Sequence, residues 1–115
     1  MAELETFETI IKTISSRSYR EWVYLPRNEQ WSLHSRCATL EMNEVPPELE
    51  DEPDAGIPQF AKLHNLREVV PVETLQEIVD NLRQQNPSAT IDEIFTAFEF
   101  YYDRDAFIDL SGKRN

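Results

Sequence analysis

Carboxylates are the groups in this sequence with the greatest capacity for chemistry. Asp and Glu account for 22 of the 115 residues, against 11 Lys and Arg, and the formal net charge is −11. Some of these acids recur at spacings of three and four within two stretches expected to be helical, which places them on one face of each helix. The acids of the first stretch are Glu73, Glu77 and Asp80, and those of the second are Asp92, Glu99 and Asp103.

A third anionic element is the segment EVPPELEDEPDAG at residues 44–56, which holds six acids, three prolines and no base. The prolines exclude a regular helix or an inner strand, so the sequence predicts an acidic connecting loop over 44–58 that could also act as a docking surface. The loop acids counted as candidate binding residues are Glu48, Glu50, Asp51, Glu52 and Asp54. Residues 41–110 together carry 17 acids against four bases, whereas residues 1–40 are neutral overall.

The acids could in principle be catalytic or bind a metal ion, but the surrounding residues do not favour either. General acid–base catalysis needs a carboxyl group in an apolar pocket, and these acids fall on faces expected to be exposed. The stretch DRDAFID resembles a calcium loop, but Ile108 replaces the required glycine and Arg114 the final glutamate. His34 and Cys37 make half of a zinc motif without a second cysteine. We therefore expect no enzyme, no metal and no cofactor.

The charge distribution indicates the kind of partner instead. Nucleic acid and anionic lipid both require a basic face, so direct binding to either is disfavoured. A basic protein is favoured because opposite fields accelerate association. Solubility alone is the competing explanation for an acidic surface.

Three features of the sequence concern its location in the cell. The start MAELETFETIIKTI lacks a signal peptide's basic region, and no apolar run reaches the ~20 residues of a membrane helix. The single cysteine suits a reducing compartment, so the sequence predicts a soluble cytoplasmic protein.

Hydrophobic spacing predicts the elements that would position these acids. Apolar residues from Leu4 to Ile14 follow helical spacing, and the patterns at about 21–25 and 36–42 are typical of two short antiparallel strands. A helical turn is plausible at 60–63, and helices are expected at 72–85 and 91–102. Thr90 and Glu93 form a capping box at the start of the last helix. The predicted fold class is α+β, with three main helices packed on a small β-hairpin in one domain (1–110), followed by a flexible tail (111–115).

An aromatic cluster occupies the end of the last predicted helix. Spacing places Phe98 and one of Tyr101 and Tyr102 in the core, while Phe100 lies off that stripe and could be covered by the following segment DRDAFIDL. Core packing is favoured for the cluster as a whole. The alternative is an exposed aromatic side chain, surrounded by acids, that anchors a protein interface.

The stretches REWVYLP with the later Trp31, VETLQEIVDNLRQQ and NPSATIDEIFTAFEFYYDRDAF together resemble small acidic bacterial immunity proteins. Proteins of this kind belong to contact-dependent growth-inhibition and related polymorphic toxin systems, and the resemblance covers roughly residues 20–108. It implies a cytoplasmic inhibitor that binds a cognate toxin, often a nuclease with a basic cleft. It carries over no individual functional residue.

The hypothesis from the sequence is therefore a non-enzymatic immunity or inhibitor protein that neutralises a toxin through its acidic surface. The alternative is a small acidic adaptor or regulatory subunit that binds a cellular protein without any toxin.

Overall fold

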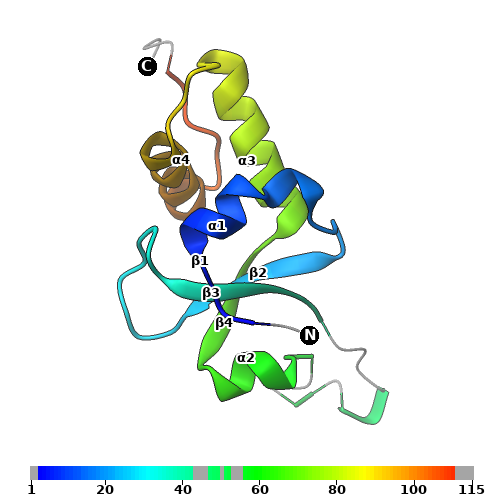
Figure 1. Cartoon of the computed structure of the whole chain (residues 1–115). Coiled ribbons are helices and arrows are strands. Elements are labelled where there is room, and N and C mark those ends of the chain that lie inside the picture. Colours follow the sequence, from blue (N-terminus) through cyan, green and yellow to red (C-terminus); the bar gives the residue numbers. More distant parts are fainter. Residues whose placement is uncertain (1–2, 43–46, 50, 53–55, 111–115) are drawn as a thin grey trace.

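The fold is α+β and consists of a four-stranded antiparallel sheet with helices on both faces (Figure 1). The computed structural model describes residues 3–42, 47–49, 51–52 and 56–110. The strands are β1 (Glu5–Thr6), β2 (Glu21–Pro26), β3 (Arg36–Glu41) and β4 (Leu66–Pro71), in the spatial order β1-β3-β2-β4. The helices are α1 (Phe7–Lys12), α2 (Gln59–Leu63), α3 (Val72–Gln85) and α4 (Ile91–Arg104), with 3-10 turns η1 (Ile14–Ser16) and η2 (Pro47–Leu49).

The central hairpin confirms the two strands predicted from alternating apolar residues. β2 and β3 are antiparallel, with Trp22 opposite Leu40 and Tyr24 opposite Ala38. Because successive side chains of a strand point to opposite faces, Val23 and Leu25 enter one core while Tyr24 enters another.

The hairpin is nevertheless only half of the sheet, which corrects the predicted architecture in detail. β4 lies in LREVVP, where the sequence predicted no strand, and it pairs with β2 so that Val23 faces Val70. The helices number four in the described residues, and only α3 and α4, with 14 residues each, are long. No helix there is long and apolar enough to cross a membrane.

The first helix is shorter than the apolar spacing from Leu4 to Ile14 predicted. Its start is fixed at Thr6, whose hydroxyl accepts a hydrogen bond from the Thr9 N–H at 3.2 Å. Glu5 precedes that cap and pairs with Cys37 in the sheet. Leu4 packs in the core on the opposite side of the sheet from Ile14, so the two do not share one helix face.

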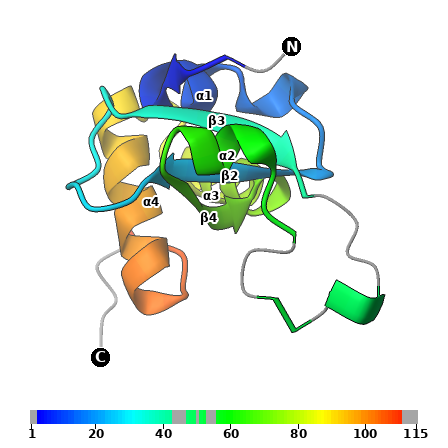
Figure 2. The same ribbon diagram turned by 90° about the horizontal axis from the view of Figure 1, so that it is seen from below.

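The sheet separates two hydrophobic cores of unequal size. Residues of α1, α3 and α4 pack on one face in the larger core, and α2 covers the other face over the smaller core (Figures 1 and 2). Phe98 of α4 lies fully buried in the larger core, where its ring centroid is 4.9 Å from that of Phe7. The prediction that Phe98 is a core residue is confirmed.

The capping box at the start of α4 is confirmed in both directions. The Thr90 hydroxyl accepts from the Glu93 N–H at 3.2 Å, and the Glu93 carboxylate accepts from the Thr90 N–H at 2.8 Å. We expect Thr90→Ala to lower the free energy of unfolding by about 1 kcal/mol in urea titration, because the N–H of Glu93 loses its acceptor. Thr96→Ala is the matched control, since it makes the same change at an exposed position inside α4. Equal losses in the two variants would contradict a capping role for Thr90.

Candidate protein-binding surface

Of the candidate acids of α3, Asp80 borders α1 and η1. Glu73, Glu77 and Asp80 are all exposed, as their spacing predicted. Asp80 lines a hollow of about 230 Å³ together with Lys12 of α1 and Arg83 of its own helix. The negative charge of Asp80 is therefore partly offset by two nearby bases.

The acids of α4 lie in two other places. Asp92, at the start of the helix, lines a hollow of about 280 Å³ with Ile108 and Leu110 of the C-terminal segment. Glu99 and Asp103, two turns and more further on, lie beside the connection between β2 and β3. The structure thus keeps Glu99 and Asp103 together and separates them from Asp92 and from the acids of α3.

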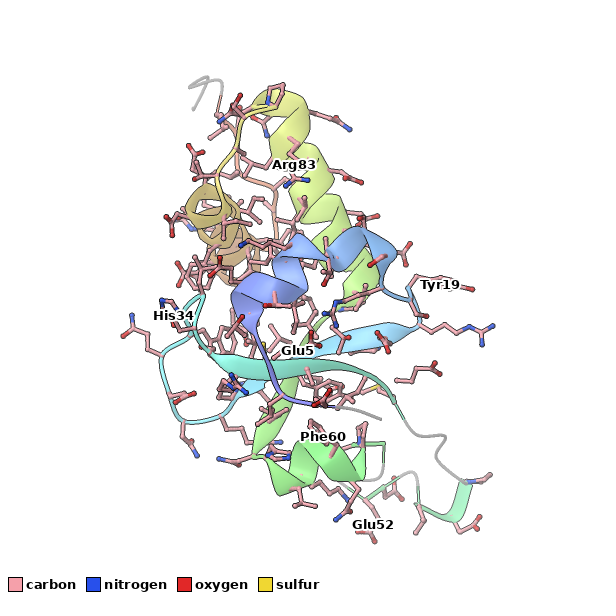
Figure 3. All side chains as sticks on the ribbon, viewed as in Figure 1. Glu5, Tyr19, His34, Glu52, Phe60 and Arg83 are labelled. Carbon is pink, nitrogen blue, oxygen red and sulfur yellow. The ribbon has the colours of Figure 1, made fainter. Side chains whose placement is uncertain are left out.

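The described acids of the 44–58 loop lie at the opposite end of the molecule from α4. Glu48, Asp51 and Glu52 are exposed, and Glu52 lies beyond α2 in Figure 3, far below the position of α4 in the same view. The described loop acids and the α4 acids therefore do not form one continuous surface. Glu50 and Asp54 lie outside the described residues.

The most distinctive arrangement of acids is a pocket between α4 and the β2–β3 connection, with a volume of about 280 Å³. We call it the acidic pocket; its lining residues are Glu29, Gln30, Trp31, Glu99, Tyr102 and Asp103. Tyr102 is 39% exposed, whereas Trp31 is half-buried. This is the exposed aromatic side chain surrounded by acids that the sequence offered as an alternative to simple core packing.

Trp31 holds the two sides of the acidic pocket together. Its indole N–H donates to the Pro26 carbonyl at 2.8 Å, and its ring lies edge-on to Tyr102 at a centroid distance of 5.0 Å. The same ring contacts Phe98, at 6.1 Å between centroids. One backbone hydrogen bond and two aromatic contacts therefore hold this ring within the pocket wall.

Among the described residues, three carboxylates and no basic side chain line the acidic pocket. In the portion of the chain that the structure describes, the ion pairs are Lys12 with Glu8 and Arg17 with Glu5, so Glu29, Glu99 and Asp103 have none. Arg104, the base nearest in sequence, places its guanidinium 5.2 Å from the centroid of the Phe100 ring instead. Within the described part of the chain, the pocket is therefore a negative site whose carboxylates have no ion-paired base.

A larger hollow of about 580 Å³, near β1 and β3, is also lined by acids. It already contains a cation, because Arg17 donates two hydrogen bonds to the Glu5 carboxylate at 2.7 and 3.0 Å and a third to the Thr39 hydroxyl at 2.9 Å. The Arg17 guanidinium donates these three hydrogen bonds and a fourth to the Thr13 hydroxyl at 2.9 Å, and together they hold this region in place. No aromatic side chain lines it.

Sequence reasoning identified Glu99 and Asp103 but not Glu29 or Trp31 as parts of a common site. Trp31 entered the sequence analysis only through the resemblance, and it follows a turn at Asn28, whose φ is 59°. The sequence does place Trp31 close to Glu29 in a polar stretch, which could have indicated a binding site. It could not show that Trp31 contacts α4, because that contact depends on long-range packing.

The Cys37 thiol is an unfavourable metal ligand or nucleophile in this fold. Cys37 is fully buried in β3, whereas His34, three residues earlier, is exposed. Burial, followed by the nearby Glu5 carboxylate, raises the pKa of the thiol to about 12. Over the described residues no group of three or more His, Cys, Asp or Glu side chains could hold a metal ion.

The raised pKa of Cys37 predicts a loss of stability at alkaline pH. Between pH 9.0, the ordinary pKa of the thiol, and about 12, the unfolded chain releases a proton that the folded protein retains. The free energy of unfolding should therefore fall as pH rises through this window, by at most about 1.4 kcal/mol per unit for one group. In Cys37→Ala the slope measured by urea titration from pH 9 to 10 should be shallower. An unchanged slope would show that the thiol is not protected by burial.

These features define an acidic α+β protein with a preformed aromatic and carboxylate pocket on one side of its larger helical layer. Residues 4–110 match the model of a family described as "Domain of unknown function (DUF7716)", and the chain belongs to that family. No curated protein matches the chain, and no solved structure does.

Proposed function

We propose that this protein is a non-enzymatic immunity or inhibitor protein, which binds and neutralises a cognate toxin through the surface around the acidic pocket. The observation that supports the proposal is the group of three unpaired carboxylates, Glu29, Glu99 and Asp103, around the exposed ring of Tyr102. Aromatic anchors surrounded by polar side chains are the typical centre of a protein interface.

A nuclease is the toxin class that this surface suits best. A nuclease binds phosphates in a cleft lined by Lys and Arg, so a carboxylate surface can occupy that cleft in place of the substrate. The net charge of −11 also favours rapid capture of a basic protein at low salt. The proposed inhibitor blocks substrate access by binding alone and needs no chemistry of its own.

Co-expression tests the proposal directly. The gene for this protein is expressed together with the adjacent candidate toxin gene, and cell growth and co-purification are measured. Restored growth together with a stable complex is the expected result. Toxicity that persists in the presence of the folded protein contradicts the immunity function.

The adaptor alternative gives a different outcome in the same experiment. An adaptor is expected to co-purify with a basic cellular protein encoded in a metabolic or regulatory operon, and to have no effect on any toxin. The contribution of overall charge to either complex is measured with Glu73→Lys and Glu77→Lys together. This double variant adds four positive charge units at exposed positions outside the acidic pocket.

A further inference from the structure

The acidic pocket is the right size for one side chain of a partner protein. Pockets for small organic ligands and cofactors usually have volumes of roughly 300–1,000 Å³, and this one has about 280 Å³. It lies between an exposed stretch of α4 and the β2–β3 connection, where a protruding residue of another chain can reach it. The pocket can therefore admit a single inserted side chain of a partner protein.

The charge of the lining residues selects a cationic side chain. Carboxylates enter the pocket lining from two elements, Glu29 from the connection and Glu99 with Asp103 from α4. None of the three is neutralised by a base within the described residues. Like charges brought together in this way repel each other, and an inserted cation relieves that repulsion.

The aromatic residues distinguish arginine from lysine. A guanidinium is planar, so it can stack on an aromatic ring and also form two parallel hydrogen bonds with one carboxylate. The acidic pocket presents both kinds of group, since Trp31 and Tyr102 lie beside Glu99 and Asp103. The same pair of hydrogen bonds between a guanidinium and a carboxylate already occurs within this protein, where two nitrogens of Arg17 donate to the Glu5 carboxylate.

We propose that the acidic pocket receives an arginine side chain of the protein partner, with its guanidinium held between the Trp31–Tyr102 rings and the surrounding carboxylates. This inference rests on the proposed function, because it names the chemistry by which the partner is recognised at the same site. It makes the pocket a specific anchor, whereas the remaining acids provide long-range attraction.

A titration of the full ¹⁵N-labelled chain with a blocked tripeptide, acetyl-Gly-Arg-Gly-amide, tests the inference by NMR. We expect saturable shifts of the Trp31 indole N–H and of the amides of residues 29–31 and 99–103. The matched peptide with citrulline, which has nearly the same shape without the charge, should produce no saturable shift there. The lysine peptide should bind several-fold more weakly than the arginine peptide.

Two variants make the test sharper. Glu99→Gln with Asp103→Asn removes two charges at exposed positions and should weaken arginine-peptide binding at least about fivefold, because hydrogen bonds to charged groups are the stronger ones. Glu73→Gln with Glu77→Gln removes the same charge from exposed positions that do not line the pocket, and it should leave the affinity within about twofold, because salt screens charges that make no direct contact. Equal shifts with arginine and citrulline peptides, or equal effects of the two double variants, would overturn the inference.

The inference and the proposed function can fail separately. If a toxin complex forms but the arginine peptide does not perturb residues 29–31 and 99–103, the inhibitor function stands and the arginine pocket is wrong. If the peptide binds as expected but no toxin is neutralised, the pocket stands and the immunity function is wrong.

Discussion

Replacing Phe98 with alanine is expected to lower the free energy of unfolding by about 3–5 kcal/mol. Phe98 is fully buried, and its ring lies within 6.4 Å of the rings of Phe7, Phe95, Trp31 and Tyr102, as measured between centroids. Its removal leaves a cavity among aromatic residues that come from different elements and cannot easily collapse together. Urea titration monitored by far-UV circular dichroism measures the loss. A domain at the lower end of ordinary stability, about 5 kcal/mol, would retain little of that stability.

Phe107→Ala provides the matched control for that experiment. Phe107 is 42% exposed and contacts Tyr101 at a centroid distance of 5.3 Å, outside the larger core. We expect it to cost clearly less than Phe98→Ala, because less apolar surface is lost from the folded state. Similar losses for the two variants would contradict the central position of Phe98.

The second large effect is expected for charge reversal in the acidic pocket. Glu99→Lys with Asp103→Lys should raise the dissociation constant for the basic partner at least about tenfold, because interfacial charge pairs couple by ~1.5 kcal/mol or more. Both residues are exposed, so the fold should be retained. Isothermal titration calorimetry on the purified complex gives the constants. The salt dependence of binding should also weaken, since fewer opposite charges meet in the complex.

The α3 variant, Glu73→Lys with Glu77→Lys, separates local contact from general attraction. It changes the net charge by the same amount at exposed positions outside the acidic pocket. Binding by overall charge alone would make the two double variants equally weak. Recognition at the acidic pocket leaves the α3 variant close to the original protein.

The sequence predicted those parts of the fold whose causes are local. The helix of α3, the capping box at Thr90 and the β2–β3 hairpin each depend on residues within a short stretch of chain. β4 was missed because its partner β2 lies about 40 residues earlier, and short apolar runs do not reveal such pairings. β1 was missed because only Glu5 and Thr6 pair with β3, within what looked like one continuous helix.

The candidate site was predictable to a similar extent. Helical spacing showed which acids would be exposed, and all six candidates on α3 and α4 are exposed. Spacing could not show which acids meet, because this depends on how α4 packs against the β2–β3 connection. Only the structure adds Glu29 and Trp31 to Glu99 and Asp103, and only it separates these acids from Asp80 with its neighbours Lys12 and Arg83.

The segment after α4 illustrates the same limit. DRDAFIDL does fold back, as the sequence suggested, but Phe107 contacts Tyr101 and the Ile108 carbonyl accepts a hydrogen bond from the Gln85 side chain at 2.7 Å. Phe100 is half-buried and is covered by Arg104 of its own helix. The segment after α4 therefore contacts Tyr101 and the end of α3, whereas the sequence had suggested that it would cover Phe100.

Hydrogen–deuterium exchange of the protein alone and in complex with its co-purified partner tests the location of the binding surface most directly. Binding at the acidic pocket predicts slower exchange in peptides that cover residues 28–33 and 99–104, with α2 unaffected. Slower exchange confined to α2 and β4, with those two regions unchanged, would contradict a partner seated on the acidic pocket.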